Sequence, residues 1–358
     1  MATMNDKDIS QQLAGAVKAA AAARGPLAIC GGGTKRFYTG EPRGEPLDVT
    51  GHRGVVSYEP TELVITARAG TPLAAVEAAL AEKGQMLGFE PPHFGAAATL
   101  GGTIACGFSG PRRPYTGSAR DFVLGATIVN GKGEIVRFGG QVMKNVAGYD
   151  ISRLMVGAFG TLGVLLDVSL KVLPKPAREI TLAFEMPADK AIATMNAWAG
   201  QPLPLSGACH LGDTLYMRLS GSEPGVRAAH TKLGGEVVET GAEFWRELRE
   251  QEHGFFRDDT PLWRLSVPPA TLPIDLPGKS CLDWGGAQRW LKSAAPADDI
   301  RRAAERAGGY AGLFRGAETK VAGRFILAPN LAALSRHIKQ AFDPSALLNP
   351  ADTSLLLG

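Results

Sequence analysis

Short apolar runs alternate with polar and glycine-rich breaks along the first half of the chain. Residues 7–24 are rich in alanine and predict a helix, which Gly25-Pro26 ends. The apolar residues 27–30 predict a short strand that leads directly into a glycine-rich loop. Residues 62–68 alternate apolar and polar positions, and this pattern predicts a second strand.

The segment after this strand predicts a helix. Leu73, Val76 and Leu80 recur at helical spacing and are expected on its buried face. Thr71 is the expected N-cap, because its hydroxyl can accept a hydrogen bond from a free N–H group of the first turn. Gly84 is expected to end the helix.

A hairpin and a long strand are predicted next. The run DFVLGATIVNGKGEIVRF contains two strand-like stretches joined by residues 130–133, and Asn-Gly between apolar runs favours a hairpin. A further glycine-rich region starts as a loop with a short helix and ends in a strand at about 163–173. Pro174 and Pro176 mark a boundary.

Beyond this boundary the sequence alternates strand and helix signals and has fewer glycine clusters. Strands are predicted at 215–221, 262–268, 279–286 and 320–327, and helices at 243–256 and 297–307. An amphipathic helix in the tail is expected to end at Asp343-Pro344.

Length and composition narrow the function classes. The chain has 358 residues, enough for two or three compact units. Its formal net charge is only +3 and its basic residues are scattered, so the charge pattern argues against nucleic-acid binding. Its four cysteines lie far apart, so no CxxC pair could hold zinc or an iron–sulfur cluster, and buried thiols in a reducing compartment are expected. The acidic N-terminus does not resemble a signal peptide, and no apolar run reaches the roughly 18 residues of a membrane span. We therefore expect a cytoplasmic protein, with peripheral attachment at the inner membrane through partners left open.

Three glycine-rich loops, at 31–40, 98–121 and 144–163, each adjoin a predicted strand. The pattern G-x-G-x-x-G fails, because no helix is expected after the first loop and the third loop has the wrong spacing. Residues 278–280 resemble the end of the P-loop pattern G-x-x-x-x-G-K-[ST], but the pattern needs glycine five positions before Gly278, where this chain has Pro273. Consecutive N–H groups without side chains form concave anion sites, so three such loops on one surface suit a long ligand with a pyrophosphate and two ring systems.

Six segments carry a family pattern in a fixed order: CGGGTKRF, YEPTELVITARAGTPLAAVEAAL, GFEPPHFGAAATLGGTIACGFSGPRRPYTGSARD, MKNVAGYD, GAFGTLGVLLDVSLKVLP and DPSALLNP. They cover about half of the chain and resemble the FAD-binding flavoproteins of the vanillyl-alcohol oxidase type, whose FAD domain is called the PCMH fold. The resemblance implies an α+β protein with a two-part PCMH-type FAD-binding domain at 1–176. It further implies a smaller α/β cap domain with an antiparallel sheet at 177–328, and a C-terminal helix and tail at 329–358 that return to the FAD domain.

The resemblance also implies which residues bind FAD. It assigns the pyrophosphate to Gly31, Gly32, Gly33 and Thr34 with Lys35 beside them, and the diphosphate and flavin to Thr99, Gly101, Gly102, Thr103, Ser109 and Gly110. It assigns the adenosine end to Gly117, Arg120, Asp121, Gly163 and Val164, and the isoalloxazine ring to Pro91, Pro92 and Asn349. These loops are expected to lack side chains because the cofactor lies against their backbone.

The resemblance bears on how FAD is attached. Members with covalent FAD use a histidine soon after the first loop or a cysteine in the second. Residues 35–37 contain no histidine, and Cys106 is only loosely in register with the cysteine position. Noncovalent FAD is therefore expected.

Members of this family that oxidise 2-hydroxy acids need a cation for the carboxylate and a base for the hydroxyl proton, so the resemblance implies catalytic residues of these two kinds. Related dehydrogenases hold a metal with paired histidines, but the six histidines here form no H-x-H or H-x-x-x-H pair, so no metal site is expected. The candidate bases are His93 and His210, and the candidate cations are Arg264 and Arg315. Each also has an interpretation without a catalytic role: a structural or solvent-facing position for His93, a core or sheet position for His210, and a surface position for the arginines.

Cap segments FWRELREQEHGFF, CLDWGGAQRWL and YAGLFRG are similar to those of the FAD-binding subunits of bacterial glycolate oxidases. This resemblance implies a subunit that takes part in oxidising glycolate to glyoxylate and passes electrons to an acceptor other than NAD. Its expected partners are a larger FAD-linked catalytic subunit and an iron–sulfur subunit. Two alternatives stay open: a self-sufficient FAD-dependent oxidoreductase for another small hydroxy acid or alcohol, and a flavin-fold assembly subunit without turnover of its own.

Overall fold

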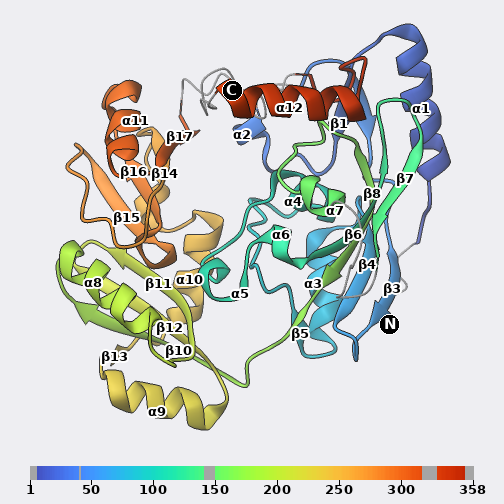
Figure 1. Cartoon of the computed structure of the whole chain (residues 1–358). Coiled ribbons are helices and arrows are strands. Elements are labelled where there is room, and N and C mark those ends of the chain that lie inside the picture. The colour runs from blue at the N-terminus through green and yellow to red at the C-terminus, as the bar shows by residue number, and fades with distance from the viewer. Residues whose placement is uncertain (1–5, 40–41, 141–149, 317–328, 351–358) are drawn as a thin grey trace. The chain divides into compact units, whose positions relative to one another are not determined.

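A computed structural model describes residues 6–39, 42–140, 150–316 and 329–350, which form two compact units (Figure 1). The first unit takes in the described residues of 1–108, 118–174 and 320–358, and the second those of 109–117 and 175–319. The mixture of helices and antiparallel sheets confirms the expected α+β class. Residues 109–117 were expected in the FAD-binding part but belong to the second unit.

The first unit is built around a five-stranded antiparallel sheet with the order β3-β4-β8-β6-β7. Its strands are β3 (Val55–Glu59), β4 (Val64–Arg68), β6 (Val123–Val129), β7 (Ile135–Gly139) and β8 (Val164–Lys171). Two smaller pairs accompany it: the parallel β1 (Leu27–Cys30) and β2 (Glu45–Asp48), and the antiparallel β5 (Gln85–Met86) and β9 (Leu173–Pro174). The helices are α1 (Ser10–Ala23), α2 (Arg36–Thr39), α3 (Leu73–Ala81), α4 (Leu100–Cys106), α6 (Ala119–Phe122), α7 (Ile151–Leu154) and α12 (Pro329–Phe342).

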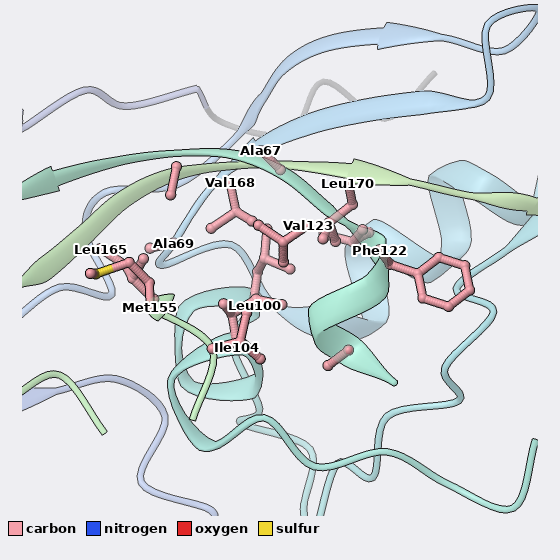
Figure 2. Packing of buried hydrophobic residues seen from close by; sticks show 14 of the residues in the cluster. Ala67, Ala69, Leu100, Ile104, Phe122, Val123, Met155, Leu165, Val168 and Leu170 are labelled. Carbon is pink, nitrogen blue, oxygen red and sulfur yellow. The ribbon is translucent and has the colours of Figure 1, made fainter. Parts of the chain in front are cut away.

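One hydrophobic cluster of this unit lies between the sheet and the helices α3 and α4, and a second is formed by residues of α1, β1, β2, β6 and β8. Leu73, Val76 and Leu80 are completely buried, which confirms the predicted apolar face of α3. Figure 2 shows Leu100 and Ile104 of α4 beside strand residues of the same hydrophobic cluster. Burying such side chains stabilises the fold by about 1.5–3 kcal/mol each and fixes the loop from which α4 starts.

The second unit holds an eight-stranded antiparallel sheet with the order β13-β10-β12-β11-β15-β16-β14-β17. Its strands are β10 (Arg178–Glu185), β11 (Leu205–Leu211), β12 (Thr214–Gly221), β13 (Glu236–Val237), β14 (Leu262–Ser266), β15 (Lys279–Asp283), β16 (Gln288–Lys292) and β17 (Tyr310–Arg315). The helices are α5 (Arg113–Thr116), α8 (Ala188–Ala199), α9 (Glu223–Leu233), α10 (Gly241–Glu250) and α11 (Ala297–Arg306), with single 3-10 turns η1 (Gly254–Phe256) and η2 (Trp284–Gly286).

Several local predictions need correction. Thr71 does not cap α3: its hydroxyl accepts a hydrogen bond from Gly54 N–H at 2.9 Å and donates to Gly54 O at 3.2 Å, so it joins two distant loops. The helix predicted at 243–256 stops at Glu250, because Gln251 takes the left-handed conformation (φ 56°). The strand predicted at 320–327 lies outside the described residues. In the described part of the chain, no helix has the length and apolarity that crossing a membrane requires.

Candidate functional site

One cavity in the first unit brings together residues from all three glycine-rich regions. It holds about 800 Å³ of space, part of it open to solvent. Its lining consists of Ile29, Cys30, Gly31, Gly32, Gly33, Thr34, Lys35, Arg36, Thr39, Val49, Ala69, Thr99, Gly101, Gly102, Ala105, Cys106, Phe159, Gly160, Gly163, Leu165 and Asn349. The predicted contacts 31–35, Thr99, Gly101, Gly102, Gly163 and Asn349 all lie there.

The first glycine loop follows β1 and packs against the second. A Cβ atom on Gly32 would lie 1.5 Å from the backbone oxygen of Ala97, and one on Gly31 would lie 2.9 Å from the hydroxyl of Thr99. The protein's own packing therefore requires glycine at both positions, in addition to the cofactor contact that the resemblance implies. Contrary to expectation, a single helical turn, α2, opens after this loop.

The second loop is fixed from both sides. The Thr99 hydroxyl accepts a hydrogen bond from Gly102 N–H at 3.2 Å and so caps α4. Gly101 donates its N–H to Ala69 O at 2.7 Å, and a Cβ on Gly101 would lie 2.7 Å from the Ala69 methyl group. Only glycine fits this approach between α4 and the end of β4.

The third wall is formed by Phe159, Gly160 and Gly163 together with Asn349 from the far end of the chain. Gly160 has a φ of 70°, which favours glycine, and a Cβ there would lie 2.9 Å from the Asn349 amide nitrogen. Asn349 donates from Nδ2 to Phe159 O at 2.7 Å, and its Oδ1 accepts the Ile29 N–H at 2.6 Å. Its side chain therefore joins β1 to the third glycine region.

The charged side chains among the described lining residues are Lys35 and Arg36. Lys35 is buried, and its ammonium group donates to His93 O at 3.2 Å and to the Thr34 hydroxyl at 3.3 Å. Arg36 is exposed at the rim. A cavity with main-chain N–H groups and two cations suits an anionic ligand.

Other predicted cofactor contacts do not line this cavity. Four of them are buried: Pro91, Pro92, Thr103 and Val164. The Thr103 hydroxyl has no hydrogen-bond partner among the described residues. Gly117 ends α5, and Ser109 and Gly110 lie in the second unit.

The predicted turn at the adenosine end has another role in the fold. The Asp121 carboxylate accepts hydrogen bonds from Ser118 N–H and Ser118 Oγ–H, both at 2.7 Å. The bond from Ser118 N–H, together with the Asp121 backbone N–H that the Ser118 side chain accepts, forms a capping box at the start of α6. Arg120 lies exposed on the same short helix.

Two of the four catalytic candidates, Arg264 and Arg315, lie on the paired strands β14 and β17 of the second unit. In the first unit, the His93 imidazole lies 2.9 Å from Glu77 of α3. In the second unit, His210 is buried in β11 with Nε2 2.9 Å from Met186 O, which supports its sheet role. Arg264 of β14 and Arg315 of β17 are half-buried, and burial lowers the pKa of Arg315.

Sequence reasoning missed several lining residues, among them Arg36, Cys30 and Gly160. Arg36 could have been found, since it is a cation directly after the first loop. Gly160 lies in the third glycine-rich region, but nothing in its spacing places it opposite Asn349. Groups of three or more potential metal ligands do not occur among the residues that the structure describes.

The cavity fits FAD by its chemistry. Three bare backbone segments and two cations face it, as a pyrophosphate requires, and the apolar side chains of Ile29, Val49 and Leu165 can cover ring surfaces. When bound, FAD would supply a two-electron acceptor, able to take up a hydride.

Comparisons with known proteins show what this chain is similar to. Residues 9–139 match the family model described as FAD binding domain. The chain is 49% identical over 350 residues to the glycolate oxidase subunit GlcE of Escherichia coli strain K12, covering 97% of this chain and 98% of that protein. A shorter stretch of 84 residues is 44% identical to the glycolate oxidase subunit GlcD of Bacillus subtilis strain 168, covering 24% of this chain and 18% of GlcD.

A solved structure supports the fold. Alkyldihydroxyacetonephosphate synthase matches with a TM-score of 0.68 at 16% identity, covering 95% of this chain and 74% of that one. At this identity the likeness concerns the fold alone. Because the sequence relationship to GlcE extends over nearly the whole of both proteins, the chain belongs to the GlcE family of FAD-binding glycolate oxidase subunits.

Proposed function

We propose that this chain is the FAD-carrying subunit of a complex that oxidises glycolate to glyoxylate and passes the electrons to an acceptor other than NAD. The observation that carries the proposal is the 49% identity to GlcE along 98% of that protein. The printed name of this relative describes a subunit, which supports function within an assembly. A larger flavoprotein subunit and an iron–sulfur subunit are the proposed partners.

The chain's own residues would hold the cofactor in the cavity of the first unit. The N–H groups of residues 31–33 would face the pyrophosphate, with Lys35 and Arg36 balancing its charge. Gly101 and Gly102, whose N–H groups bond to Ala69 O and the Thr99 hydroxyl, would let the cofactor approach by lacking side chains. Ile29, Leu165 and Phe159 would exclude water from the rings. Asn349 would fix the distance between the two walls that it joins.

We further propose that FAD is held without a covalent bond. Cys106 and Cys30 are half-buried and line the cavity, so their thiols are the groups on which this point must be tested. Acid precipitation of the purified holoprotein separates the two cases. Flavin that stays in the supernatant supports noncovalent binding, and flavin that stays with the pellet contradicts it.

The function is tested by reconstitution and stopped-flow absorbance. The purified chain, mixed with FAD and then freed of unbound cofactor by gel filtration, should keep a flavin spectrum. Glycolate should bleach this spectrum slowly or not at all until the proposed partner subunits are added. Rapid bleaching of the isolated chain by glycolate would instead support a self-sufficient oxidoreductase. A chain that takes up no flavin would support the assembly role and contradict the proposal.

A further inference from the structure

A buried ion pair holds the last described segment of the chain on the first unit. Lys339 of α12 is 5% exposed and Asp343, one turn later, is 1% exposed. The Lys339 ammonium group donates to Asp343 Oδ2 at 2.7 Å, to Thr161 O at 2.7 Å and to Leu348 O at 3.0 Å. These three acceptors use all three of its N–H groups.

Asp343 completes the same network. Its Oδ1 accepts Leu347 N–H at 3.1 Å, and its Oδ2 accepts Leu348 N–H at 2.7 Å. Burial lowers the pKa of Lys339, which the hydrogen bond from its ammonium group to Asp343 partly opposes. Because desolvation offsets most of the attraction in a buried ion pair, such a pair contributes little net stability, and a role in fixing geometry is the better explanation.

The backbone segment that the ion pair holds, residues 347–349, ends at the wall of the cavity. Leu348, whose carbonyl and N–H are both held, pairs with Leu27 of β1 in a parallel bridge. The next residue, Asn349, donates its N–H to Leu27 O at 2.9 Å and takes a φ of 42°. This turn directs its amide toward Ile29 N–H and Phe159 O, at the cavity wall.

We propose that Lys339 and Asp343 are positioning residues for the FAD site, which they shape by holding residues 347–349 so that Asn349 joins the two walls of the cavity. The inference rests on the FAD-binding role proposed above. Lys339 itself does not line the cavity, so it acts through Asn349 and not by touching the cofactor.

The test is a double-mutant cycle on FAD affinity, measured by quenching of flavin fluorescence on titration with protein. Lys339→Met and Asn349→Ala should each weaken binding at least about tenfold, and the double variant should be no weaker than the weaker single variant. Arg336→Met, on the exposed side of α12, is the matched control and should keep the affinity of the unvaried chain. Circular dichroism and melting temperature report folding separately.

Asp343→Asn, which keeps the shape of the side chain, replaces Lys339→Met if that variant does not fold. Unchanged FAD affinity in a folded variant at position 339 or 343 would overturn the inference, as would losses that add fully in the double variant. If the unvaried chain itself binds no FAD, the proposed function fails first. If the unvaried chain binds FAD and the variants bind it equally well, only this inference is refuted.

Discussion

Replacing Gly32 by alanine tests whether the contact between the first two glycine loops shapes the cofactor site. The added Cβ would lie 1.5 Å from Ala97 O and 2.5 Å from its carbonyl carbon, and both are backbone atoms. Since nonbonded heavy atoms keep roughly 3.5 Å apart, one loop would have to move by about 2 Å. Overpacking of this kind costs about 1–3 kcal/mol of folding stability.

The same movement should cost affinity for FAD. If two main-chain N–H groups lose charged acceptors worth about 1.5 kcal/mol each, binding weakens by about 3 kcal/mol, or roughly 100-fold. Fluorescence titration with FAD measures this loss, and urea denaturation measures stability. Gly15→Ala in α1, where a Cβ meets nothing within 4 Å, is the control and should raise stability by about 0.5–1 kcal/mol. A Gly32→Ala variant with unchanged FAD affinity and unchanged stability would refute the reasoning.

Three further side chains give measurable expectations. Asp121→Ala removes the capping box of α6 and should lower the free energy of unfolding by about 0.5–2 kcal/mol; an unchanged urea midpoint would contradict this. Trp284→Phe removes the hydrogen bond from Nε1 to Gly110 O (3.0 Å) and weakens the cation–π contact with Arg113, which a phenyl ring keeps in part. We therefore expect a loss of about 1–2 kcal/mol of folding stability, seen as a lower melting temperature. Burial, and then the nearby Asp283 carboxylate, raises the pKa of Tyr115 above its ordinary 10.0. The unfolded chain therefore releases this proton first, and folding stability should fall as pH rises above about 10. Ultraviolet titration of Tyr115→Phe should lack the last tyrosine to ionise, and a titration curve that keeps it would show that another residue is responsible.

Elements with local stop signals could be predicted from the sequence. The strand at 27–30 begins after Gly25-Pro26 and matches β1, and Asp343-Pro344 ends α12 as expected. The Thr71 prediction was wrong because its partner, Gly54, lies 17 residues away, and no local pattern reveals that hydrogen bond.

Strand β16 shows why other elements were missed. Its sequence, QRWLK, looks like an exposed segment, yet all five residues are buried. Arg289 donates to the carbonyl oxygens of Gly286, Thr271 and Leu272, and Lys292 is paired with Asp258 at 2.7 Å. These partners come from loops that only the folded chain brings near.

The candidate site also has features that the sequence predicts and features that depend on tertiary contacts. The glycine loops could be identified because bare backbone is visible in the sequence, whereas the packing of Gly31 on Thr99 is a tertiary contact. Likewise, Lys339 looks like one polar residue of an amphipathic helix. Its burial depends on Thr161 O and Leu348 O, which approach from elsewhere in the first unit.

The most direct measurement of where FAD binds is the rate of cysteine alkylation with and without the cofactor, located by mass spectrometry. Cys30 and Cys106 are half-buried and line the cavity, whereas Cys209 and Cys281 are fully buried with their sulfur atoms 3.6 Å apart. The hydrogen bond with Cys281 and burial also raise the pKa of the Cys209 thiol, so this pair should react only on unfolding. We predict that FAD at 100 times its dissociation constant slows alkylation of Cys30 and Cys106 by about 100-fold. Saturating FAD that binds the chain but leaves both rates unchanged would contradict the assignment of this cavity as the flavin site.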